Sequence, residues 1–135
     1  MIYNRAFIRS DLSKFDPHDE NVKSYMHEVK ESDHAWTIMR ENVPVCIWGY
    51  CIVWEGRHHF WALMSKESAR CMLNIIKIGQ EKLDQMRVRR MEATVSCDFP
   101  QAIKFIERLG FTREGRLAKF FNDGNDAYMY ARVAA

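Results

Sequence analysis

The chain has 135 residues, of which 47% are hydrophobic and 28% are charged. This length suits one domain with a packed core, and the apolar content excludes an intrinsically disordered chain. Twenty basic and 18 acidic residues give a formal net charge of +2. So small an excess argues against a nucleic-acid partner. We therefore expect a single domain over residues 1–135.

No segment of the sequence has the pattern of a membrane anchor or a secretion signal. The longest uncharged stretch, residues 42–54, is thirteen residues long, whereas a spanning helix needs about 20. Residues 1–10 hold two arginines and lack the apolar centre of a signal peptide. The sequence thus predicts a cytoplasmic protein without membrane contact, or one packaged inside a larger particle.

Four cysteines stand among apolar neighbours and form no C-x-x-C pair: Cys46, Cys51, Cys71 and Cys97. This pattern favours small buried thiols in a reducing compartment. A zinc site recruiting His58 and His59 is the alternative. The five-residue spacing of Cys46 and Cys51 on a predicted strand puts them on opposite faces, which argues against zinc.

The first third of the chain predicts one strand and two helical segments. Residues 3–9 are expected to form a short strand, and residues 11–15 a short helix or turn. A helix then follows Asp16-Pro17, because apolar residues recur on one helical face: Val22, Tyr25, Met26 and Val29.

The middle of the chain changes to β-type residues. Three antiparallel strands are predicted over residues 35–41, 44–54 and 58–64, separated by turns. The middle strand is apolar at both odd and even positions, so we expect helices on both faces of the sheet.

The last half returns to mixed periodicity. A long helix over residues 67–86, capped by Ser65 or Ser68, precedes a strand over 91–96. A second helix starts near Pro100 and ends at Gly110. Two final strands, 117–121 and 127–133, are predicted to form a hairpin closed by residues 122–125.

This order of elements and several motifs resemble the GNAT superfamily of acyl-CoA-dependent N-acyltransferases. AIKFIERLGF at residues 102–111 is similar to the family's penultimate helix, A-I-x-x-Y-E-x-x-G-F. Glu114-Gly115-Arg116 and the closing DAYMYAR at residues 126–132 also fit, as does Gly49-Tyr50 on the third strand. The resemblance implies an α+β fold with a mixed, mostly antiparallel sheet and helices on both faces.

The resemblance also implies where acyl-CoA would bind. Strands 58–64 and 91–96 would splay apart near Met64 and Ser96, and backbone groups of Ala62, Leu63 and Met64 would pair with the pantetheine arm. An ordinary closed sheet is the alternative.

The loop that holds pyrophosphate in this family, Q/R-x-x-G-x-G/A, has no glycine here. Residues 64–70 read MSKESAR. The resemblance assigns phosphate contacts to the small and basic residues of this loop: Ser65, Lys66, Ser68, Ala69 and Arg70. Glu67 would repel an anion there.

Side chains for proton transfer are less well matched. The family's acidic Tyr is replaced by Ile106, next to Phe105. His59, with a pKa near neutrality, is the candidate base, and a solvent-facing hairpin histidine is the alternative. Glu92 and Asp98 are further candidate bases, although Asp98 also suits a helix cap.

These departures look most like a degenerate GNAT-like subset encoded by short-tailed bacteriophages. Two functions are therefore expected. The first is an N-acetyltransferase that uses acetyl-CoA to acylate an amine of a protein or small molecule. The second is a catalytically inactive protein that serves virion assembly or binds a host or phage protein.

Overall fold

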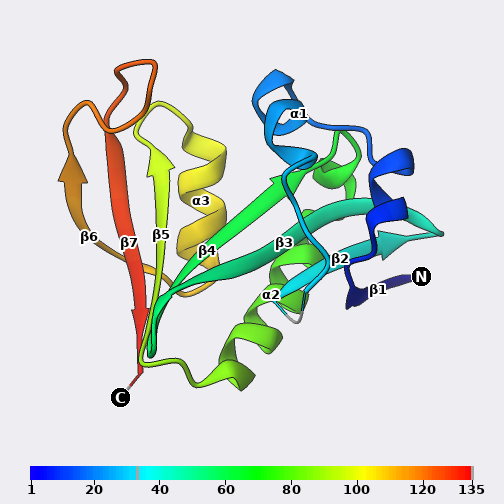
Figure 1. The fold of residues 1–135 in the computed structure, drawn as a ribbon, viewed down its shortest axis with the longest axis horizontal. Coiled ribbons are helices and arrows are strands. Elements are labelled where there is room, and N and C mark those ends of the chain that lie inside the picture. Colours follow the sequence, from blue (N-terminus) through cyan, green and yellow to red (C-terminus); the bar gives the residue numbers. More distant parts are fainter. Residues whose placement is uncertain (33, 135) are drawn as a thin grey trace. The chain divides into compact units, whose positions relative to one another are not determined.

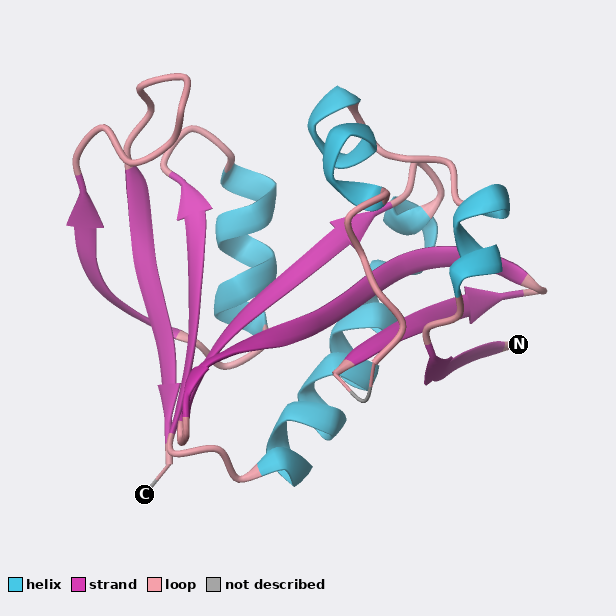
Figure 2. Cartoon of the chain, viewed as in Figure 1, coloured by secondary structure: helices cyan, strands magenta, loops and turns pink. Residues whose placement is uncertain are grey.

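The computed structural model describes residues 1–32 and 34–134, and those residues form seven strands in one sheet (Figures 1 and 2). The strands are β1 Ile2–Ala6, β2 Ala35–Arg40, β3 Val43–Trp54, β4 Arg57–Met64, β5 Arg90–Ser96, β6 Thr112–Leu117 and β7 Ala127–Val133. The helices are α1 Glu20–Met26, α2 Met72–Met86 and α3 Pro100–Arg108, with 3-10 turns η1 Arg9–Lys14 and η2 Ser68–Cys71. The strand order is β1-β2-β3-β4-β5-β7-β6, and the β4–β5 pair is parallel. No helix of the described residues has both the length and the apolar character needed to cross a bilayer.

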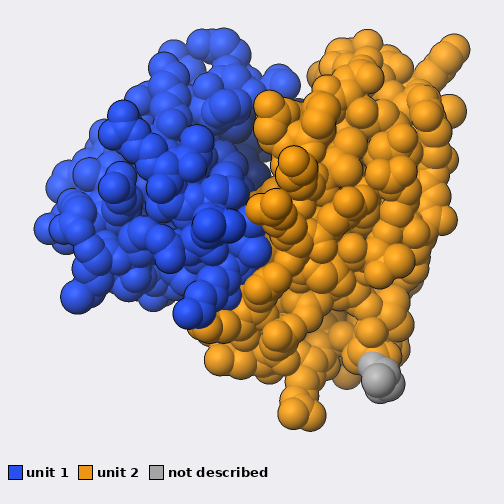
Figure 3. Space-filling model, turned by 180° about the vertical axis from the view of Figure 1, so that it is seen from behind, with its two compact units in different colours: residues 1–51, 61–78 blue, residues 52–60, 79–135 orange. Residues whose placement is uncertain are grey.

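The chain divides into two compact units, coloured separately in Figure 3. Unit 1 comprises residues 1–51 and 61–78, and unit 2 comprises residues 52–60 and 79–135. The strands β3 and β4 and the helix α2 each contribute residues to both units.

In unit 1, both faces of β3 are covered, as its two-sided apolar sequence predicts. Ile47 belongs to a buried cluster with residues of η1 and α1, including Leu12 and Met26. The neighbouring Cys46 points to the opposite face. There it lies near Cys71 at the end of η2, and burial raises the pKa of the Cys46 thiol.

In unit 2, α3 lies against β5 and brings a row of apolar side chains with it. Ile106 and Leu109 are buried, and Phe111 contacts Phe60 of β4 with ring centroids 5.5 Å apart. Gly110 has φ of 96°, a left-handed conformation that suits glycine after a helix end. The predicted stop of this helix is therefore confirmed.

Several predicted boundaries were wrong. The first strand ends at Ala6 rather than at residue 9, because η1 begins at Arg9. The long helix is not continuous from residue 67, because η2 forms a separate 3-10 turn before α2. The penultimate strand is β6, Thr112–Leu117, rather than residues 117–121. It is an exposed sheet edge, so it lacks the apolar alternation that a sequence pattern detects.

Candidate active site

In unit 1, a segment of the chain itself occupies the backbone at the end of β4. Pro17 and Ser65 form an antiparallel bridge. The His18 N–H donates to the Met64 carbonyl at 3.0 Å, and the Lys66 N–H donates to the Asp16 carbonyl at 2.9 Å. We call residues 16–18 the strap. The Met64 carbonyl, at a position predicted to pair with pantetheine, is therefore engaged by the strap in this conformation.

The backbone N–H groups of the predicted phosphate loop are also engaged. The N–H of Ser65 donates to Val45, and that of Ser68 donates to the Ser65 carbonyl. The Ser65 hydroxyl accepts from the Glu67 N–H at 3.2 Å. The N-cap position of η2 is held by Glu67 without a side-chain cap, so the predicted capping by Ser65 or Ser68 was wrong. An anion at a helix start needs free N–H groups. The loop therefore does not present an open backbone cradle here.

The side chains of the loop separate into two classes. Ser65 and Ser68 are buried, and the Ser68 hydroxyl donates to the Ser65 carbonyl at 2.8 Å. Lys66, Ala69 and Arg70 are exposed. Each cation makes one long ion pair, Lys66 Nζ with Asp16 at 3.9 Å and Arg70 Nη1 with Glu67 at 3.9 Å. The groups of this loop that are accessible to a phosphate are therefore the side chains of Lys66 and Arg70, not the serine hydroxyls.

In unit 2, the parallel ladder between β4 and β5 is short. It joins Arg57 to Arg90, His58 to Met91 and His59 to Glu92, and the next pair, Phe60 and Ala93, is not part of it. On its other side β5 is paired with β7 along its whole length. β4 and β5 are therefore not hydrogen-bonded along their full length, and the gap predicted near Met64 and Ser96 stays a prediction.

Glu92 lies at the centre of an ion-pair cluster on one face of β5. Its carboxylate accepts from Arg57 Nε at 2.5 Å and from Arg90 Nε at 2.7 Å, and Arg90 also binds Glu114. These guanidinium groups lower the pKa of the buried Glu92 to about 2, against the cost of burial. A carboxylate with so low a pKa is a poor proton acceptor near neutral pH. The structure thus argues against the predicted role of Glu92 as a base.

His59 stands beside Glu92 in the ladder, and partners in a parallel ladder point to the same face. Burial lowers the pKa of His59, the Glu92 carboxylate partly offsets that effect, and Arg57 adds to it. A lowered pKa keeps the imidazole neutral at pH 7, which is the form that can accept a proton.

The remaining predicted residues are less well placed for proton transfer. Asp98 is exposed and its side chain does not cap α3, whose N-cap position is held by Phe99. Ile106 is buried at the position of the family's Tyr. A phenol does contact the residue that follows Ile106. The Tyr130 hydroxyl of β7 donates to Glu107 at 2.6 Å and accepts from Arg113. With both partners in place, that hydroxyl ties α3 to the β6–β7 hairpin.

The sequence interpretation missed two features. One is the strap, for which Pro17 in an otherwise helical stretch was the sole signal. The other is the arginine pair around Glu92. Titratable residues alternate along both strands, as Arg57-x-His59 and Arg90-x-Glu92. Alternate residues of a strand share one face, so this spacing could have indicated the ion-pair cluster.

Several solved structures that are similar to this chain are acetyltransferases. The ribosomal-protein-S18-alanine N-acetyltransferase from Escherichia coli matches with a TM-score of 0.74 and 16% identity, covering 100% of this chain and 96% of that one. A GNAT-family acetyltransferase from Bacillus anthracis matches with a TM-score of 0.74 and 19% identity, covering 98% and 94%. This chain has the GNAT acetyltransferase fold. Ard1 from Thermoplasma volcanium, at a TM-score of 0.71 and 12% identity, covers 99% and 98%.

The GNAT fold is thus shared over the whole length in both directions, as the predicted order of elements implied. Neither a family model nor a curated protein matches the sequence. Identity this low carries the fold alone, so the chemistry of the GNAT-like chain has to be argued from its own residues.

Proposed function

We propose that this protein is an acyl-CoA-dependent N-acetyltransferase that transfers an acetyl group to an amine of a protein or small molecule. The observation that carries the proposal is the end-to-end likeness to N-acetyltransferases, with 100% of this chain and 96% of the Escherichia coli enzyme covered. The short β4–β5 ladder supports it, because backbone groups not used between strands can bind a ligand.

The reaction is a direct displacement. The neutral amine attacks the thioester carbonyl carbon, the new C–N bond forms, and the C–S bond breaks to release CoA as a thiolate. His59 accepts the proton that the amine loses, and the thiolate takes a proton from water. No tyrosine is needed as the acid in this scheme, consistent with Ile106 at that position.

The cofactor contacts follow from which groups are exposed. We assign the diphosphate of acyl-CoA to the side chains of Lys66 and Arg70, with Ala69 leaving room for it. Backbone groups of Ala62, Leu63 and Met64 would receive the pantetheine arm. Use of the Met64 carbonyl requires that the strap release it.

A second candidate is a catalytically inactive GNAT-fold protein that acts in virion assembly or binds a host protein, as in the phage-encoded subset. The engaged N–H groups of residues 65–68 favour it, because a loop whose donors are satisfied internally gains less from a phosphate. In that case the strap is a fixed part of the fold.

Thermal unfolding with and without acetyl-CoA separates the two candidates. A ligand that binds only the folded state stabilises it by about 2.7 kcal/mol at a hundredfold excess over Kd. The enzyme therefore predicts a rise in melting temperature that saturates with acetyl-CoA. An unchanged melting temperature at millimolar acetyl-CoA supports the inactive candidate.

A further inference from the structure

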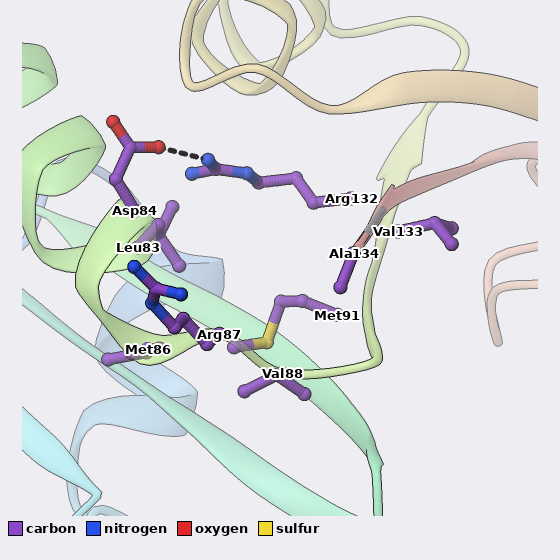
Figure 4. Close-up of a pocket in the computed structure, with 9 residues that line it drawn as sticks. All are labelled: Leu83, Asp84, Met86, Arg87, Val88, Met91, Arg132, Val133 and Ala134. Atoms are coloured by element: carbon purple, nitrogen blue, oxygen red, sulfur yellow. Dashed lines mark hydrogen bonds and ion pairs between the residues drawn. The ribbon is translucent and has the colours of Figure 1, made fainter.

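Unit 2 contains a surface pocket that the proposed acetyl transfer does not use. Its volume is about 490 Å³, which is in the range of small-molecule sites. The lining comes from the end of α2, the residues after it, and the strands β5 and β7 (Figure 4): Leu83, Asp84, Met86, Arg87, Val88, Met91, Arg132, Val133 and Ala134. Met91 and Glu92 are consecutive in β5, so the pocket and the ion-pair cluster are on opposite faces of that strand.

Arg132 brings an unsatisfied donor to this pocket. One terminal nitrogen of its guanidinium donates to Asp84, as the dashed line in Figure 4 shows. The other, Nη1, is buried and has no partner among the described residues. A buried donor without an acceptor is costly, and an anionic ligand oxygen would relieve that cost.

Arg87 brings a second positive charge, at a backbone position where a side chain is unfavourable. It directly follows α2 and has φ of 49°, in the left-handed region where glycine is preferred. Within the described part of the chain, its guanidinium makes no hydrogen bond or ion pair. The Arg87 side chain is thus held in an unfavourable backbone conformation at a position that lines the pocket.

About half of the lining around these two cations is apolar. Leu83 and Met91 are buried at 6% and 3% exposure, and Val88 and Val133 continue the surface. Asp84, the sole acid of the lining, is already paired with Arg132. The pocket therefore combines one spare positive charge with room for a short hydrocarbon.

From this combination we propose that the pocket binds a small organic carboxylate with an apolar body. The carboxylate bridges Arg132 Nη1 and the Arg87 guanidinium, and the hydrocarbon lies against Val88 and Val133. An inorganic anion satisfies the charges but not the apolar walls, and a neutral alcohol does the reverse. The proposal is independent of whether the protein transfers acetyl groups.

Isothermal titration with hexanoate tests the site, with hexylamine, hexanol and inorganic phosphate as comparison ligands. The full chain should bind hexanoate saturably at millimolar concentration and bind each comparison ligand at least tenfold more weakly. Arg87→Gly should weaken hexanoate binding by at least tenfold while its melting temperature stays equal or rises, because glycine relieves the left-handed residue. Loss of binding then cannot be attributed to unfolding.

Arg108→Gln, an exposed arginine of α3 that does not line the pocket, is the matched control and should bind like the parent. Arg132→Gln should weaken binding as Arg87→Gly does. The proposal is overturned if hexanoate and hexylamine bind equally, if Arg87→Gly binds like the parent, or if no saturable binding occurs.

Discussion

The N–H of Lys66 donates to the carbonyl of Asp16 at 2.9 Å, so a residue predicted to face a phosphate is bonded to the chain's own strap. A second residue of the strap, His18, donates its N–H to the Met64 carbonyl. If acyl-CoA uses the β4 backbone, these two hydrogen bonds have to open. The state of the strap is thus linked to cofactor binding.

Amide hydrogen exchange measures that link. Saturating acetyl-CoA should speed exchange at His18 and Lys66, because release of the strap takes the Met64 and Asp16 carbonyl acceptors from these two N–H groups. If acetyl-CoA binds and both amides keep their exchange rates, the strap is static. The loop then meets the cofactor through side chains alone.

The charges of the loop should control CoA affinity in opposite directions. Glu67→Gln removes a negative charge near the diphosphate and should strengthen binding by on the order of 1 kcal/mol. Arg70→Ala should weaken binding by about 1.5–3 kcal/mol, since it removes a charge-assisted hydrogen bond. Titration calorimetry with CoA measures both.

Lys77→Ala is the matched control, because Lys77 is an exposed cation further along α2. Its affinity for CoA should equal that of the parent. Equal affinities for all three variants and the parent would mean that residues 65–70 are not a phosphate site.

His59 should govern the pH dependence of acetyl transfer. Its pKa is lowered, so the activity of the parent should be lost only below the ordinary histidine pKa of about 6.5, where the imidazole becomes protonated. His59→Gln should lower kcat by roughly 10²–10⁴-fold and remove that acid limb. His58→Gln, on the opposite strand face, should keep both kcat and the pH profile. An unchanged pH profile in His59→Gln would exclude His59 as the base.

Glu92 should matter for stability more than for chemistry. Its folded pKa of about 2 lies below its ordinary value of 4.5. The stabilisation is therefore fully present above pH 4.5 and is lost as the pH falls toward 2. Glu92→Gln should lower the free energy of unfolding at pH 7 by about 1.5–3 kcal/mol, because it removes the carboxylate that accepts charge-assisted hydrogen bonds from the partly exposed Arg57 and Arg90.

Chemical denaturation at pH 7 and pH 3 measures this effect. The destabilisation caused by Glu92→Gln should shrink at pH 3. Glu114→Gln, the half-exposed partner of Arg90, should cost less than about 1 kcal/mol at either pH. Equal costs for the two substitutions would contradict the central place of Glu92 in the cluster.

The order of strands and helices could be predicted from the sequence because several elements carry a local pattern of apolar residues or glycine. The two-sided apolar run of β3, the helix period of α2 and the glycine stop of α3 each have a local physical cause. The boundaries of β6 could not be predicted, since an exposed edge strand needs no alternation.

The candidate site was less predictable because its features depend on long-range contacts. Glu92 reads as a free carboxylate in the sequence, and its arginine partner Arg57 is 35 residues away. The strap joins residues 16–18 to residues 64–66 by backbone hydrogen bonds, which leave no side-chain pattern.

Acetyl transfer itself tests the central claim most directly. The parent and His59→Gln are incubated with acetyl-CoA and amines that include peptides with an N-terminal alanine, since one structural neighbour is named for alanine N-acetylation. Mass spectrometry and a thiol assay then follow the acceptor and the released CoA. We predict that the parent adds one acetyl group to an acceptor amine with equimolar CoA release, and that His59→Gln is slower by 10²-fold or more. Acetylation at the same rate without protein, or no binding of acetyl-CoA to the parent at millimolar concentration, would contradict the proposed function.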